Sequence, residues 1–434
     1  VRDKVRDKVK NPAFRNSLNR FEAKEKIVMK ICKRESRDMK GFAVVALCGC
    51  ICLGAFHNNA GALTRKGYED HMQEQFRNQQ EVHANDPAGE SFRYIMISRE
   101  GAKTIARYGK NDKLLRGGKD AREIIEWSMT MADVVILQKG QYELATTLEI
   151  PRPDTTLIIG KGATVKPAKD ATLASLSEGH GIYYALIRNR NRDNVKIINL
   201  GTLSIPQSAD SLSRGGVGLI FDGRNGGRTG INGGLILSAG ALRHQETWVV
   251  DSANVDIPLI CDEDYINTAL AMEGCEDCRI GIIAALAGTK ARENEALDLN
   301  SYCERTTIAT IIGTASAEQV IDINNSPDTR VGEVVGYGKD KRFPRHLVEH
   351  LEYPLFGHRL TQKPHIEHSK GSEIKNEKVV DKNMKEWRRT VETPGFPDSL
   401  PLFNIKVTLT AVFEDGSEEQ VFDKSYQFDL EGSN

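Results

Sequence analysis

Aromatic side chains, net charge and long apolar runs are all scarce in this chain of 434 residues. Aromatic residues make up 6%, and 59 basic against 60 acidic side chains leave a formal net charge of -1. A nucleic-acid-binding domain usually carries a basic excess, so this balance argues against nucleic acid as a partner. The apolar run from Phe42 to Phe56 is shorter than the roughly 20 residues that a spanning helix needs, which argues against a stable membrane span.

The apolar run is flanked in the manner of a secretory signal. Lys40 lies before it and Ala60-Gly61-Ala62 follows it, and this order is typical of a signal peptide that is cleaved after export. We therefore assign residues 1–62 to a leader with a signal peptide at 39–62, and residues 63–92 to a polar spacer. The expected location is secreted or periplasmic, with the cell surface as a variant.

Cysteine is scarce beyond the leader, where only Cys261, Cys275, Cys278 and Cys303 remain. Export would permit disulfides. Cys275 and Cys278 have the CxxC spacing of zinc and redox sites, but no second CxxC or nearby histidine pair accompanies them. We predict small buried side chains instead, with Cys275 near Cys303 on adjacent turns of a repeating fold.

After the spacer, the chain changes from one helix to a series of strands. Asp120 and Glu123 have the spacing of a capping box, and apolar residues behind them predict a short helix. Strand-like runs follow at 134–137, 147–150 and 156–159, with glycine, proline and aspartate between them. Strands with no helices between them predict an all-β fold.

Short alternating strands then recur at a nearly constant spacing. Asp298 and Asp322 are 24 residues apart, and Gly313 and Gly336 are 23 apart. Coils of this length can stack on one another and bury a continuous core. The repeat predicts a parallel β-helix, a solenoid, over residues 93–340.

The repeat ends near Lys339. Residues 341–400 are charged and are predicted to be irregular, whereas 401–434 alternate around Asp415-Gly416, a strong hairpin signal. So few strands do not make a stable separate domain. We therefore expect this C-terminal β-hairpin extension to pack on the end of the β-helix or on a neighbouring subunit of a homo-oligomer.

Two glycine-containing turns carry a resemblance to a known superfamily. Lys139-Gly140-Gln141-Tyr142 and Ile159-Gly160-Lys161-Gly162 each stand beside short strands. With the helix before them, they resemble the first coil of the pectate-lyase-like superfamily, and the resemblance runs from about Arg93 to Tyr337. It implies a right-handed parallel β-helix with an N-terminal capping helix. Because that superfamily includes lyases, hydrolases, epimerases and phage tailspikes, it implies the fold more closely than the activity.

Strand alternation places acidic side chains on the outside of the later coils. The residues with core parity are Leu297, Leu299, Ile321 and Ile323. Asp298 and Asp322 then face outwards on stacked coils that lie roughly 4.8 Å apart. Two carboxylates at that distance repel one another unless a cation or a shared proton relieves the charge. Asp298, Asp322 and Glu318 are therefore the candidate ligands of Ca²⁺.

Two kinds of glycan cleavage fit such a face. In a lyase, Ca²⁺ would neutralise a substrate uronate while a lysine or arginine removes the adjacent proton. In a hydrolase, one carboxylic acid would protonate the glycosidic oxygen while a carboxylate activates water. The candidate catalytic residues are Asp298, Asp322, Glu295, Lys290 and Arg292. The candidate substrate-binding residues are Arg279, Arg305 and Glu273.

The interpretation that we favour is a secreted carbohydrate-active enzyme that cleaves an acidic, uronate-containing polysaccharide by β-elimination. A glycoside hydrolase on the same fold is one alternative, and a non-catalytic glycan-binding adhesin or tailspike-like scaffold is another. Aspartate and asparagine at strand ends also cap turns and stack in ladders without any catalytic role.

Overall fold

The structure is a computed structural model. It describes residues 94–429 apart from 110, 179–180, 206–215, 225–229, 244, 266–267, 288–295, 301–302, 315–319, 324–325, 339–347, 350–370, 395 and 398–401. The predicted leader and spacer, residues 1–92, lie outside this part of the chain. Among the described residues, no helix combines the length and the apolar character needed to cross a membrane.

A short helix lies at the N-terminal end of a long β-structure. Helix α4 (Ala121–Met131) begins at Asp120, whose carboxylate accepts hydrogen bonds from the backbone N–H groups of Arg122 and Glu123, as the capping spacing predicted. Ile124, Ile125 and other apolar residues on one face of α4 join the main core. Before the helix lie β1 (Tyr94–Glu100), β2 (Lys103–Tyr108) and β3 (Leu114–Gly118), joined antiparallel to one another.

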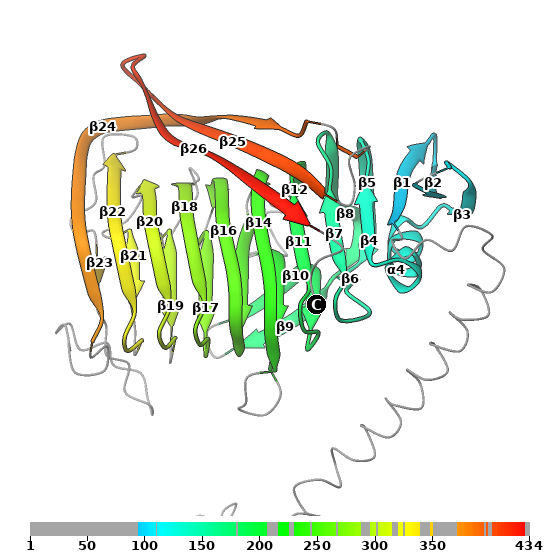
Figure 1. Cartoon of the computed structure of the whole chain (residues 1–434), viewed down its shortest axis with the longest axis horizontal. Helices are drawn as coiled ribbons and strands as arrows, with labels where there is room; N and C mark the ends of the chain where they lie inside the picture. The colour runs from blue at the N-terminus through cyan, green and yellow to red at the C-terminus, as the bar shows by residue number, and fades with distance from the viewer. Residues whose placement is uncertain are drawn as a thin grey trace, which may run out of the picture. The chain divides into compact units, whose positions relative to one another are not determined.

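After α4, the chain passes repeatedly between two sheets of parallel strands (Figure 1). The first sheet contains, side by side, β4 (Val134–Leu137), β7 (Thr156–Ile159), β11 (Lys196–Asn199), β14 (Ile231–Arg243), β16 (Ser252–Tyr265), β18 (Arg279–Ala287), β20 (Thr307–Thr314) and β22 (Arg330–Gly338). The second contains β6 (Leu148–Glu149), β10 (Gly181–Arg190), β13 (Gly216–Asp222), β15 (Gln245–Val250), β17 (Leu270–Glu273), β19 (Leu297–Asn300), β21 (Ile321–Ile323) and β23 (Val348–Glu349). We call one passage through both sheets a coil.

Further short strands widen the first sheet or lie beside the second. β5 (Gly140–Thr146), β8 (Ala163–Thr172) and β12 (Thr202–Ser204) pair in parallel and continue into the last residues of β14. β9 (Ala174–Glu178) pairs antiparallel with β10. Strands therefore account for nearly all the regular structure, and the predicted all-β class is confirmed.

The register of the late coils agrees with the sequence repeat. Asp298 pairs with Asp322 in the second sheet, and Gly313 pairs with Gly336 in the first. Between the sheets lies one large apolar core, to which the predicted inward residues belong: Leu297, Leu299, Ile321 and Ile323. The predicted strand parity is confirmed, and it fixes which side chains the second sheet turns outwards.

One corner of each coil turns through a residue with left-handed backbone conformation. From coil to coil these residues are Asp154, Asn194, Gly233, Asn254, Asp277, Arg305, Asp328 and Gly371. The backbone N–H of such a residue donates to a carbonyl of the next coil, as from Asp277 to Glu304 and from Arg305 to Pro327, so the corners stack. Glycine, asparagine and aspartate adopt this conformation most readily, and Arg305 is the exception in the series.

The C-terminal strands cover the outer face of the first sheet. β24 (Glu373–Glu392) pairs with β22 through its first half and then turns across the coils to meet β25 (Leu402–Phe413), which pairs with β26 (Glu418–Asp429) (Figure 1). The expectation that 341–400 is irregular was therefore wrong for the residues of β24. β24 is hard to recognise in the sequence because most of its residues are charged or polar and its apolar residues are widely spaced.

The predicted hairpin is present, but it packs in a different place. Apolar side chains of β25 and β26, among them Phe403 and Phe422, share a core with Ile198 and Leu237 on the outside of the first sheet. The hairpin thus covers the side of its own chain rather than the end of the coils, because the outer face of the first sheet is itself apolar. A role for the hairpin in a homo-oligomer stays a prediction.

Candidate functional site

The two aspartates of the predicted site are neighbours on the outer face of the second sheet. Asp298 is half-buried, whereas Asp322 is only 6% exposed, so the expectation that both would be exposed was wrong for Asp322. Outward parity does not ensure exposure. Within the described part of the chain, no three acidic, histidine or cysteine side chains form a group that could hold a metal ion. Ca²⁺ takes about six to eight oxygen ligands, so this carboxylate pair does not form its site alone.

The other predicted residues are divided among different places. Glu295, Lys290, Arg292 and Glu318 lie outside the described residues. Glu273 ends β17 in the second sheet, on the same outer face as Asp298. Arg279 begins β18 in the first sheet and is exposed beside Asp256, and Arg305 lies in the corner before β20. The structure therefore does not bring the two predicted substrate-binding arginines onto the sheet that carries Asp298.

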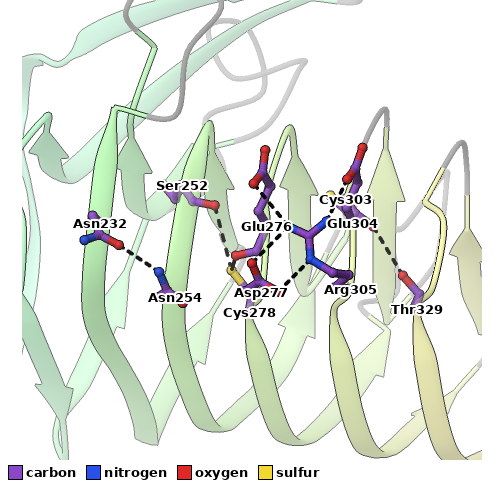
Figure 2. A network of polar contacts seen from close by, with 10 residues as sticks. All are labelled: Asn232, Ser252, Asn254, Glu276, Asp277, Cys278, Cys303, Glu304, Arg305 and Thr329. Carbon is purple, nitrogen blue, oxygen red and sulfur yellow. Dashed lines mark hydrogen bonds and ion pairs between the residues drawn. The ribbon is translucent and has the colours of Figure 1, made fainter.

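Arg305 instead joins two neighbouring corners. Its guanidinium contacts Asp277 at 2.8 and 2.9 Å, Glu276 at 3.2 Å and Glu304 at 2.9 Å (Figure 2). The guanidinium lowers the pKa of Asp277 through these hydrogen bonds. Four charged side chains are thus engaged with one another in the exposed corner, which explains how an arginine is held in a left-handed conformation.

Outward-facing residues that are in register on successive strands form one column across the second sheet. Its members are Glu149, Arg188, Ile220, Trp248, Ala271, Asp298 and Asp322. The column starts with a charged pair, continues through an apolar centre and ends with the two aspartates. A second column, two residues further along each strand, adds Arg190, Asp222 and Glu273.

The charged end of these columns forms an acid–arginine cluster, which we define as Glu149, Arg188, Asp222 and Arg224. The Nε atom of Arg188 lies 3.6 Å from Glu149 Oε2 and 3.6 Å from Asp222 Oδ2. Asp222 Oδ1 also accepts a hydrogen bond of 2.7 Å from Arg224 Nε. Two carboxylates therefore share one buried guanidinium, and a second arginine contacts one of them.

Burial dominates the electrostatics of the cluster. It raises the pKa of Glu149 and of Asp222, and the nearby charge of Arg188 only partly opposes that rise. It also raises the pKa of Asp251, which follows β15, and lowers the pKa of Arg224 despite the charges of Glu273 and Asp251. Groups with perturbed pKa values that gather at one place are typical of functional sites.

An apolar patch separates the cluster from the aspartate pair. Ile220, Trp248 and Ala271 are buried there, on the outer side of the second sheet. The Arg224 guanidinium lies 5.9 Å from the centre of the Trp248 ring, within the range of a cation–π contact. Four strand spacings separate Arg188 from Asp298, about 19 Å at the usual spacing, so the two polar groups do not act on the same bond.

The strands that carry this cluster can be predicted from the sequence, but the way in which they bring its side chains together cannot. Arg188 and Asp222 stand in apolar segments that read as strands, and their outward parity could have been assigned in the same way as that of Asp298. Their pairing could not have been assigned, because the residues that separate the two strands do not fix the register. Trp248, Arg224 and Asp251 belong to no sequence motif that would have indicated a functional site.

Comparison with known proteins identifies no relative. No protein-family model matches the chain, and no curated protein matches it in sequence. Among solved structures, it is similar to ORF18 of Geobacillus virus E2 with 9% identity over 75% of this chain and 83% of that chain, at a TM-score of 0.21. A likeness this slight carries no argument about the fold or the function.

Proposed function

We propose that the described coils form a right-handed parallel β-helix that cleaves an acidic polysaccharide on the outer face of its second sheet. The alternation of parallel strands around one core supports the solenoid. The right hand follows from the general preference of crossovers between parallel strands. The superfamily resemblance of the first coil agrees with both.

The observation that carries the function is the pair of carboxyl groups around Arg188. Cleavage of a glycosidic bond by hydrolysis needs a proton donor and a second carboxylate. A raised pKa keeps a carboxyl group protonated closer to neutral pH, which is what a donor requires. Since each carboxylate oxygen lies 3.6 Å from the same nitrogen, the two oxygens are no further apart than twice that distance. This upper limit is compatible with the separation of about 5 to 5.5 Å between the carboxyl groups of retaining enzymes and excludes most of the range of about 6.5 to 9.5 Å for inverting ones.

The arginines favour an acidic substrate over a neutral one. Arg190, which is exposed, and Arg224, which is half-buried, lie at or beside the strand ends that carry Glu149 and Asp222. Guanidinium groups bind carboxylates in a planar, two-pronged geometry, so uronate groups of a polymer suit this face. The stripe from Arg188 to Asp298, about 19 Å at the usual strand spacing, suits an extended polymer more than a small ligand.

Proposed roles follow from these positions. Glu149, the more open of the two acids, is the proton donor to the glycosidic oxygen, and Asp222, which both arginines contact, is the second carboxylate. Arg188 holds both carboxylates in place. Asp298, the more open of the two late aspartates, then faces a distant part of the same polymer through a cation bound to that polymer.

β-Elimination is the second candidate, and one observation favours it. A lyase needs a base near the uronate, and burial lowers the pKa of Arg224, which lies among Asp222, Asp251 and Glu273. Lys290 and Arg292, the bases that the sequence suggested, lie outside the described residues. The described geometry supports hydrolysis better, because its carboxyl groups are suited to donate a proton, whereas a guanidinium loses its proton very reluctantly.

The experiment is a product assay on a panel of uronate polymers, including pectins, alginates and glycosaminoglycans. Hydrolysis would release saturated reducing ends, and elimination would release unsaturated products that absorb in the ultraviolet. We expect Glu149→Gln and Asp222→Asn to lower the rate at least a hundredfold, on the scale of lost general acid–base catalysis. Glu143→Gln and Asp328→Asn are the matched controls, because both change exposed carboxylates elsewhere, and they should retain activity.

Three outcomes separate the proposals. Saturated products that depend on Glu149 and Asp222 support hydrolysis, and unsaturated products that depend on Arg224 support elimination. If no polymer yields either product and all variants still bind glycan, the protein is a non-catalytic glycan-binding scaffold and the enzyme proposal is wrong.

Export to the outside of the cell belongs to the same proposal, since extracellular polysaccharides are its substrates. The signal peptide that the sequence predicts at 39–62 supports it, although these residues lie outside the described part of the chain. Intact-mass measurement of protein from the culture medium should show a chain that starts near Leu63. A full-length product retained in cells would contradict export.

A further inference from the structure

Three cysteine side chains meet inside the stacked corners, away from the acid–arginine cluster. Cys275, Cys278 and Cys303 are each fully buried and belong to the main core. Burial raises the pKa of the Cys275 thiol, and the neighbouring thiols of Cys278 and Cys303 add to that rise. All three are free thiols in this structure.

Cys275 and Cys278 lie on either side of a tight turn. Asp277 between them has a φ of 53°, the left-handed conformation of the corner series, and the reversal keeps both thiols inside. Each thiol also contacts the preceding coil. The Cys275 thiol donates to the carbonyl oxygen of Val249 at 3.3 Å. The Cys278 thiol donates to that of Ser252 at 3.9 Å (Figure 2). The two thiols therefore lie side by side above the same segment.

Cys303 stands in a different relation to Cys275. Glu276 pairs with Glu304 across the corner, so Cys303 occupies the position of Cys275 one coil further along. Cys275 and Cys303 meet only after their two coils have stacked. Cys275 and Cys278 are separated by two residues of one turn, so their ends close at a smaller entropic cost and earlier in folding.

We propose that Cys275 and Cys278 form a disulfide within the corner turn when the chain folds in the presence of a small-molecule disulfide. The thiolate of one of the two cysteines attacks that oxidant and releases one thiol. The thiolate of the other then attacks the mixed disulfide and releases the second thiol. Two protein thiols lose two hydrogen atoms, and one disulfide oxidant becomes two thiols.

Both thiols are fully buried in the folded chain. The oxidant therefore reaches them during folding, before the neighbouring coils cover the corner.

The test is refolding of the full chain with glutathione disulfide, followed by alkylation in denaturant and peptide mapping. Cleavage after arginine and lysine gives one peptide, from His244 to Arg279, that carries Cys261, Cys275 and Cys278. We expect this peptide to take up one alkyl group after oxidative refolding and three after refolding with reduced glutathione. Fragmentation should place the one alkyl group on Cys261.

Matched variants separate the proposed pair from its neighbours. Cys278→Ser should abolish the link, whereas Cys303→Ser and Cys261→Ser should leave it intact. Peptides joined through Cys275 and Cys303, or three alkylated cysteines after oxidative refolding, would overturn the proposal. Because the wild-type map alone decides between these outcomes, the result does not depend on the folding of any variant.

Discussion

Replacement of one core leucine tests the strand parity on which the outer site depends. Leu299 is fully buried at the centre of β19, and its register partners Met272 and Ile323 on the neighbouring coils are buried as well. Leu299→Ala removes most of an isobutyl group from this stack. Loss of such a group costs the transfer free energy of its atoms and leaves a cavity.

The loss of unfolding free energy in Leu299→Ala depends on how far the neighbouring coils can move into the cavity. Parallel hydrogen bonds hold β19 between β17 and β21, so the neighbouring coils cannot close onto the cavity. We therefore expect a loss of unfolding free energy in the upper half of the roughly 2–5 kcal/mol range for leucine to alanine. Ile323→Val, which removes one methylene group nearby, should cost about 0.5–1.5 kcal/mol.

Urea unfolding followed by far-ultraviolet circular dichroism measures this change. The midpoint should fall while the slope stays constant. Thr307→Ala is the control, because Thr307 is exposed on β20 and its loss should change stability by less than about 0.5 kcal/mol. A loss below about 1 kcal/mol for Leu299→Ala would refute the parity, because core truncations of this kind cost more. Asp298 would then face the core rather than the outer surface.

Two further predictions concern charge. Burial raises the pKa of Glu149, Asp222 and Asp251 in the folded state, so their contribution to stability is complete below the ordinary carboxyl pKa and is lost as pH rises through the raised values. Asp222→Asn should therefore reduce the fall in unfolding free energy between acidic and neutral pH, and an unchanged pH profile in urea titrations would contradict this assignment. At the corner, Arg305→Gly should unfold at a higher urea concentration than Arg305→Ala, since both lose the ion pairs but only glycine relieves the φ of 54°. Equal midpoints would show that the left-handed backbone at this position costs nothing.

The sequence by itself determined the local features of this protein. Alternation in Leu297–Asn300 and Ile321–Ile323 fixed which side chains face the core, because a strand turns successive residues to opposite sides. The capping role of Asp120 and the turn at Asp415-Gly416 were likewise predictable from the sequence, since each depends on neighbouring residues alone.

Only the tertiary structure decided which side chains of different strands come together in a site. Arg188 contacts both Glu149 and Asp222 because β6, β10 and β13 stack in one register, and the long, unequal connections between these strands conceal that register in the sequence. Burial is also a property of the assembled coils. It covers Asp322 although its parity is outward, and it raises the pKa of Asp222 although arginines lie beside it. Parity is set along one strand, whereas register and burial depend on all the strands that pack around it.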